Sequence, residues 1–197
     1  MAATIRLARE QDAERMLEIY APIVRDTAIS FELEPPTLEE FKSRVTENLK
    51  VAPWLVCASE GGLLGYAYAE RHRSREAYQW SVDVSVYVAE SHHRQGVGRA
   101  LYTSLIECLR LQGFYNAYAG ITLPNPASVA LHESLAFEPV GVYRNVGYKL
   151  GQWHSVGWWE LALQGHSLPA YPVGLLDVVD TAAWKQAISI GTVLLGR

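Results

Sequence analysis

Apolar and polar residues alternate over residues 82–88, immediately before a loop that contains glycine. The apolar positions are all valine, and the residues between them are Asp83, Ser85 and Tyr87. This period of two predicts a strand with one apolar face. From Val97 the apolar residues recur at helical spacing, which predicts a helix that ends near Gly113.

The loop between this strand and helix contains Gly96 and Gly98. Glycines at the start of a helix let backbone N–H groups approach a phosphate or pyrophosphate. Two nucleotide-binding motifs fit poorly, because Arg99-Ala100 replaces the lysine of a P-loop and Leu101 replaces the third glycine of a dinucleotide fingerprint. The remaining interpretation is a loop for the pyrophosphate of coenzyme A.

The flanking sequence predicts an alternation of strands and helices. Before the central strand we expect a strand, two helices and a hairpin; the second helix begins at the capping box formed by Thr37 and Glu40. The expected ranges are 4–8, 12–26, 37–50, 54–59 and 63–71. After the central helix we expect a strand at 116–121, a helix from Asn125 to about residue 135, and strands at 138–148 and 153–163. This pattern predicts one domain over residues 1–165 and a tail over 166–197 with a short helix at 181–190.

Composition narrows the class of protein. With 197 residues, 49% of them hydrophobic, the chain can bury one sizeable core. The formal net charge of −4 provides no basic field, so we expect no nucleic-acid partner. No stretch predicts a membrane span or a signal peptide, so we expect a cytoplasmic protein that does not bind a membrane. Cys57 and Cys108 lie in apolar contexts and the histidines lack ligand spacing, so we expect no disulfide and no metal.

Several motifs together resemble the GNAT N-acetyltransferases, and among them the phosphinothricin and methionine sulfoximine acetyltransferases. The resemblance runs from about Ile5 to Leu163, and its motifs lie at residues 78–80, 85–88, 93–98, 125–128, 131–137 and 151–157. It implies an α/β (α+β) GNAT fold, in which helices flank a mixed, mostly antiparallel central sheet, here with a C-terminal extension. It also implies acetyl-CoA as co-substrate and a homodimer.

The resemblance assigns roles to particular positions. The residues expected to bind acetyl-CoA are Val86, Tyr87, Val88, Arg94, Gln95, Gly96, Val97, Gly98, Arg99, Asn125 and Ser128. Those expected to line the acceptor pocket are Phe31, Glu32, Arg73, Ser74, Arg75, Tyr78 and Ser85. Asp83 stands where the family places a carboxylate general base, and His132 where it places a histidine. The residue pattern alone favours structural roles for Asp83 and His132. For the cluster of Arg71, His72, Arg73 and Arg75 it is equally compatible with a solvated face and with substrate contact.

The chain departs from the family pattern at three positions. His93 replaces a glutamine or arginine, Asp83 is one methylene shorter than the usual glutamate, and Ala136 replaces a glycine. The first change affects the cofactor loop, the second affects the reach of the base, and the third affects packing.

An amine must lose a proton before it attacks a thioester, and a carboxylate or imidazole can accept that proton. We therefore expect an N-acetyltransferase that acts on the α-amine of a small amino-acid-like molecule such as phosphinothricin or methionine sulfoximine, and so confers resistance to such a compound. Two alternatives remain open. The acceptor is another small amine or a protein N-terminus, or the chain is a non-catalytic module that binds acyl-CoA.

Overall fold

The computed structural model describes residues 3–195. Residues 1, 2, 196 and 197, at the ends of the expected domain and tail, lie outside this range. The strands are β1 (Thr4–Leu7), β2 (Trp54–Ser59), β3 (Gly62–Arg71), β4 (Ser81–Val88), β5 (Asn116–Leu123), β6 (Glu138–Lys149) and β7 (Gln152–Ala162). The helices are α1 (Ala13–Asp26), α2 (Leu38–Asn48), α3 (Val97–Gln112), α4 (Pro126–Glu133), α5 (Leu175–Val178) and α6 (Ala182–Leu194), and three short 3-10 turns precede α1, β4 and α3.

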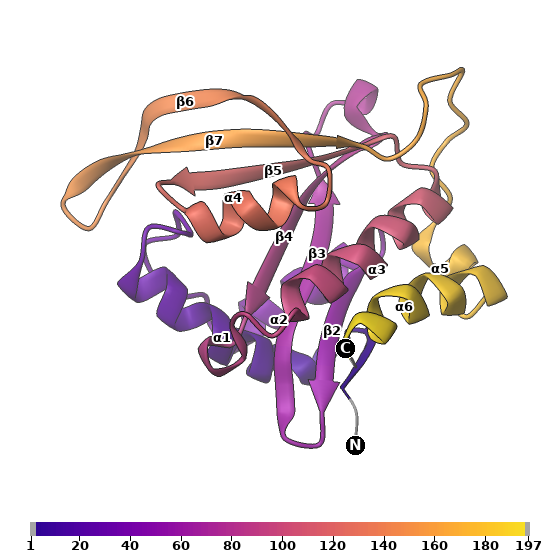
Figure 1. The fold of residues 1–197 in the computed structure, drawn as a ribbon, viewed down its shortest axis with the longest axis horizontal. Helices are drawn as coiled ribbons and strands as arrows, with labels where there is room; N and C mark the ends of the chain where they lie inside the picture. Colours follow the sequence, from indigo (N-terminus) through magenta and orange to yellow (C-terminus); the bar gives the residue numbers. More distant parts are fainter. Residues whose placement is uncertain (1–2, 196–197) are drawn as a thin grey trace.

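The seven strands form one mixed sheet in the order β1-β2-β3-β4-β5-β7-β6 (Figure 1). All neighbouring pairs are antiparallel except β4 and β5, which are parallel. The expected mixed, mostly antiparallel sheet with flanking helices is therefore confirmed. The expected strand from 116 to 121 continues to Leu123, and the tail helix starts one residue later than expected and ends at Leu194.

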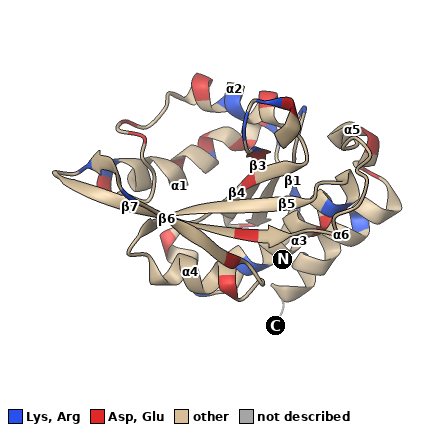
Figure 2. Ribbon diagram, turned by 90° about the horizontal axis from the view of Figure 1, so that it is seen from above, with Lys and Arg blue, Asp and Glu red and all other residues tan. Residues whose placement is uncertain are grey.

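Helices cover both faces of the sheet (Figure 2). On one face α1 and α2 pack through Met16, Val24, Phe41 and Val45 against Trp54, Val56 and Tyr66. On the other face α3 packs through Leu101, Leu105 and Leu109 against the valines of β4. The alternation of residues 82–88 follows from this arrangement, because the valines point toward α3 and the intervening side chains point toward α1 and α2.

The tail packs on the outer side of α3 (Figure 1). Leu175, Trp184 and Ala187 are buried in the same apolar cluster as α3. Ser104 Oγ donates a hydrogen bond to the carbonyl oxygen of Ile188 at 2.9 Å. Residues after 165 therefore complete the core on this face.

Candidate active site

The β4 and β5 strands separate in the middle of the sheet. Their parallel pairing covers only Ser81–Asp83 against Asn116–Tyr118. Beyond these residues β4 stays paired with β3, while β5 stays paired with β7. The edge of β4 that faces β5 is therefore unpaired from Val84 onward. A pocket lies in the gap, lined by residues 84–87 of β4 and 119–122 of β5, together with Ile29, Tyr102, Asn125, Ser128 and His132.

The N-terminus of α3 lies at the end of β4 and is open to a ligand. Gly96, its N-cap residue, has a φ of 80° and no side chain caps the helix. Arg94 also has a positive φ, of 59°. Because the first N–H groups of a helix have no partner within it, this loop presents donors at the positive end of the helix dipole. The arrangement suits a pyrophosphate, and the exposed Arg94 and Arg99 add positive charge.

His93, which departs from the family pattern, has a structural contact. Its Nε2 lies 3.0 Å from the carbonyl oxygen of Val88, and its ring is exposed. A carbonyl can only accept, so the ring nitrogen donates this hydrogen bond. The side chain therefore ties the start of the loop to the end of β4.

The opposite wall of the pocket comes from α3 and α4. The side chain of Asn125 caps α4 by accepting a hydrogen bond from Ser128 N at 3.1 Å. His132, one turn further, is buried and lies 2.7 Å from the carbonyl oxygen of Ser128 through Nδ1. Its Nε2 lies 3.1 Å from the hydroxyl of buried Tyr102. Burial lowers the pKa of His132, partly offset by the hydrogen bond to Ser128.

Asp83 is the last residue of β4 that pairs with β5, and its side chain lies on the face that carries α1 and α2. Its Oδ1 is 2.6 Å from His72 Nδ1, and its Oδ2 is 3.8 Å from Arg73 Nη1. Glu70 lies directly opposite on β3. Burial raises the pKa of the Asp83 carboxyl, and the hydrogen bond to His72 offsets part of that rise. The site thus concentrates a carboxylate, an imidazole and a guanidinium where the two strands diverge.

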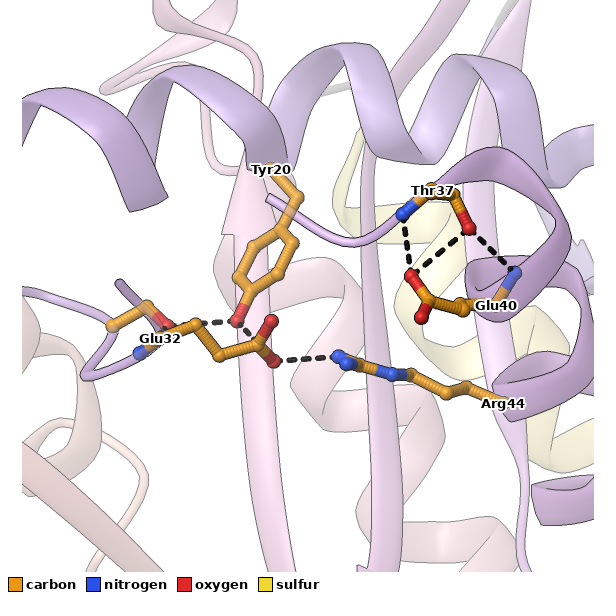
Figure 3. A network of polar contacts seen from close by, with 6 residues as sticks. Tyr20, Glu32, Thr37, Glu40 and Arg44 are labelled. Atoms are coloured by element: carbon orange, nitrogen blue, oxygen red, sulfur yellow. Dashed lines mark hydrogen bonds and ion pairs between the residues drawn. The ribbon is translucent and has the colours of Figure 1, made fainter. Parts of the chain in front are cut away.

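A cavity of about 570 Å³ opens on the same face of the sheet, between α2 and β3. Glu32, Glu70 and Tyr87 are among its lining residues. Glu32 accepts hydrogen bonds from Arg44 at 2.5 Å and from Tyr20 at 3.2 Å (Figure 3). Figure 3 shows these side chains pointing toward one another from α1, α2 and the loop that joins them. The size of the cavity is in the range of small-molecule sites.

The predicted acceptor-pocket residues fall into separate groups. Arg73 and Tyr78 surround Asp83: the Arg73 guanidinium lies 5.8 Å above the Trp158 ring, and the Tyr78 ring is 5.7 Å from His72. Ser85 pairs with Tyr68 on β3, Glu32 lies in the cavity, and Ser74 and Arg75 are exposed. Phe31 packs over Gly147 on β6. The structure therefore does not bring all seven residues to one place.

Three residues near the site were not among the sequence-based candidates, namely Tyr102, Tyr118 and Trp158, and His72 was considered only as a member of the cluster at 71–75. The pairing of β3 with β4 brings His72 beside Asp83, and the pairing of β4 with β5 does the same for Tyr118. The alternation within β3 could have indicated which side chains face Asp83, because it places Tyr66, Tyr68 and Glu70 on one face of the strand. No local pattern singles out Tyr102 or Trp158.

Comparison with known proteins identifies the class. Residues 5–158 match the family model of the acetyltransferase (GNAT) domain. The phosphinothricin N-acetyltransferase of Streptomyces viridochromogenes is 39% identical over 168 residues, which cover 85% of this chain and 90% of the relative. The L-methionine sulfoximine/L-methionine sulfone acetyltransferase of Salmonella typhimurium is 34% identical over 167 residues, covering 84% and 98%.

A solved structure agrees with these relatives. The phosphinothricin acetyltransferase of Sinorhizobium meliloti in complex with acetyl-CoA superimposes with a TM-score of 0.83 at 31% identity, covering 93% of this chain and 99% of that one. The chain belongs to the GNAT acetyltransferase family, and it is an N-acetyltransferase.

Two further features of the described residues concern metals and membranes. Between residues 3 and 195, no group of three or more His, Cys, Asp or Glu side chains is placed to hold a metal ion. Within the same range, no helix has both the length and the apolar character to cross a membrane.

Proposed function

We propose that this enzyme transfers the acetyl group of acetyl-CoA to the α-amine of a small amino-acid-like molecule, of which phosphinothricin and methionine sulfoximine are examples. The separation of β4 and β5 at Asp83 carries this proposal. The loop at Gly96 and the unpaired edge of β4 lie toward one end of this gap, and the Asp83 carboxylate lies at the other end. The relatives named for these two acceptors support the choice of substrate class.

The chain's residues fit acetyl-CoA, which supplies an acetyl thioester. The loop from Arg94 to Arg99 would hold the pyrophosphate, and the backbone of Val86 to Val88 would hold the pantetheine arm and the acetyl carbonyl. Asn125 and Ser128 line the same pocket. Fixed N–H donors toward a developing oxyanion lower the barrier to acyl transfer, and the unpaired edge of β4 can provide them.

The proton acceptor lies at Asp83 or at a group hydrogen-bonded to it, on the face of the sheet that carries α1 and α2. A free α-amine with a pKa of about 8 is mostly protonated at pH 7, so a group at this position must take a proton before attack. His132 and Tyr102 line the pocket between the strands. There they would orient the thioester and hold a hydroxyl near the leaving sulfur. Arg73 is exposed beside Asp83 and suits the acceptor carboxylate, because a guanidinium binds it bidentately.

The test measures release of free coenzyme A with a thiol reagent, using phosphinothricin, methionine sulfoximine, other small amines and a peptide panel as acceptors. We expect the fastest turnover with the amino-acid-like acceptors. Preferred turnover of a peptide or of an unrelated amine would replace the proposed acceptor. Binding of acetyl-CoA without turnover of any amine would leave only the non-catalytic alternative. Asp83→Ala and His132→Ala are expected to lower kcat more than they raise the KM for acetyl-CoA.

We also propose that two copies of the chain assemble through the β6–β7 arm, which extends beyond the rest of the sheet (Figure 1). This arm exposes Val140, Val142, Tyr143, Val146, Tyr148, Leu150 and Trp153. A monomer rarely leaves so many large apolar side chains together in water. Sedimentation should give a dimer that Trp153→Glu weakens, and a monomer at all concentrations would contradict the proposal. The cytoplasmic location and the role in resistance stay predictions.

A further inference from the structure

His72 is held firmly beside Asp83. Only 14% of its side chain is exposed, and the Nδ1 to Asp83 Oδ1 distance is 2.6 Å. The ring stacks on Tyr118 with centroids 4.6 Å apart, and its edge meets Tyr78 and Trp158. One hydrogen bond and three aromatic side chains therefore fix the orientation of the imidazole.

The hydrogen bond also fixes where the ring can accept a proton. An ionised carboxylate accepts only, so the proton of neutral His72 lies on Nδ1 and the lone pair on Nε2. Within residues 3–195, Nε2 of His72 has no hydrogen-bond partner. It is also absent from the buried polar atoms without a partner, so the atom is accessible to solvent. His132 differs, because both of its ring nitrogens have partners inside the protein.

Building on the acetyl transfer proposed above, we propose that His72 takes the proton from the acceptor amine and that Asp83 acts through it as a positioning residue. The N–H bond of the substrate ammonium breaks, its electron pair stays on nitrogen as the attacking lone pair, and the proton binds His72 Nε2. Asp83 stabilises the resulting imidazolium, which later returns the proton to water. Because aspartate is one methylene shorter than glutamate, the imidazole extends the reach of the carboxylate.

Charged and titratable groups lie near the imidazole on several elements. Asp83 and Glu70 contribute negative charge from β4 and β3, and Glu160 on β7 is the register partner of Tyr118. Arg73 provides the opposing positive charge. The phenols of Tyr78 and Tyr118 complete the surroundings. Carboxylates thus outnumber cations around the ring.

The experiment compares His72→Gln, His72→Ala and Asp83→Asn with the wild type, and uses His166→Gln as the control because His166 is exposed and lies outside the site. We expect His72→Gln to lower kcat about 100-fold, to leave the Kd for acetyl-CoA unchanged by calorimetry, and to remove the acidic limb of the profile of kcat/KM against pH. Added imidazole should partly restore His72→Ala. The ¹⁵N signals of the ring should show the Nδ1–H tautomer in the wild type and lose that preference in Asp83→Asn.

Other outcomes overturn the assignment. Asp83 is itself the base if His72→Gln keeps the acidic limb and a kcat within about threefold of the wild type, while Asp83→Asn loses the acidic limb and has a much lower kcat. A ring with its proton on Nε2 would also contradict the proposal. If the wild type acetylates no amine, the proposed function fails and His72 has no such role. An active wild type with an unaffected His72→Gln refutes only the role of His72.

Discussion

The hydroxyl oxygen of Tyr102 lies 3.1 Å from His132 Nε2, and both side chains are buried. The carbonyl of Ser128 accepts from His132 Nδ1, so Nδ1 carries the proton and Nε2 accepts from Tyr102. Burial lowers the pKa of His132, which favours the neutral ring, and both ring nitrogens already have protein partners. This suits a residue that orients Tyr102 more than one that collects a proton from the acceptor.

The first prediction concerns the pH dependence of stability. Because burial lowers the pKa of His132 in the folded state, the unfolded chain binds a proton below about pH 6.5 that the folded protein does not. The resulting stability is complete above that pH and is lost as the pH falls toward the lowered pKa. His132→Gln should reduce the slope of the unfolding free energy, by at most about 1.4 kcal/mol per pH unit.

Chemical denaturation between pH 5 and 8 measures this slope. His166→Gln is the control, because that histidine is exposed. Equal slopes in His132→Gln and the wild type would show that folding does not lower the pKa of His132.

The second prediction separates cofactor binding from backbone strain. Gly96 and Gly113 have φ values of 80° and 82°, and a Cβ at either would meet no atom within 4 Å. Alanine at either position should therefore cost about 1 kcal/mol through backbone strain alone. Only Gly96 lies in the loop at the N-terminus of α3. Gly96→Ala should weaken acetyl-CoA binding in calorimetry, and Gly113→Ala should not. Equal affinities would place the pyrophosphate elsewhere.

Local signals predicted the elements that depend on neighbouring residues. The capping box is present, since Thr37 N donates to Glu40 Oε2 at 2.7 Å and Glu40 N donates to Thr37 Oγ1 at 3.3 Å. The strand and glycine loop at 82–98 are also present, because they too depend on residues that are close in the sequence. The contact of His72 with Asp83 depends instead on the pairing of β3 with β4, and no pattern within either segment specifies that contact.

The tail and the loop after α1 also depend on contacts between distant segments, which the sequence pattern does not reveal. The weak periodicity lies in residues 166–181, where α5 has only four residues, whereas α6 buries Trp184, Ala187 and Gly191. Lys149 lies between the two strands expected at 138–148 and 153–163, yet it is buried and contacts residues more than a hundred positions away in the chain. Such long-range contacts have no signature in a single sequence.

The third prediction concerns this lysine. Lys149 Nζ donates to the carbonyl oxygens of Val24 and Ser30 at 2.6 and 2.7 Å, which fixes the loop that carries Phe31 and Glu32. Lys149→Met should leave both carbonyls unsatisfied and lower stability by about 1–3 kcal/mol. It should also raise the KM for the acceptor, because the loop lies at the cavity. Lys185→Met is the matched control, since Lys185 is exposed on α6. An unchanged KM for the acceptor in Lys149→Met would show that the loop carrying Phe31 and Glu32 does not contribute to acceptor binding.

The fourth prediction tests whether the tail is part of the folded core. A Cβ at Gly191 on α6 would collide with the carbonyl of Ala100 and the hydroxyl of Ser104 on α3. Because a helix backbone cannot move aside as a flexible side chain can, Gly191→Val should force α6 away from α3. We expect a loss of about 1–3 kcal/mol, seen as a lower midpoint in denaturant. At Gly165 a Cβ would meet nothing within 4 Å, so Gly165→Val should be nearly neutral. If Gly191→Val is equally neutral, α6 does not pack on α3 in solution. Since α3 also supplies the N-terminus proposed to bind pyrophosphate, a destabilised Gly191→Val should lose acetyl-CoA affinity only as the fraction folded falls.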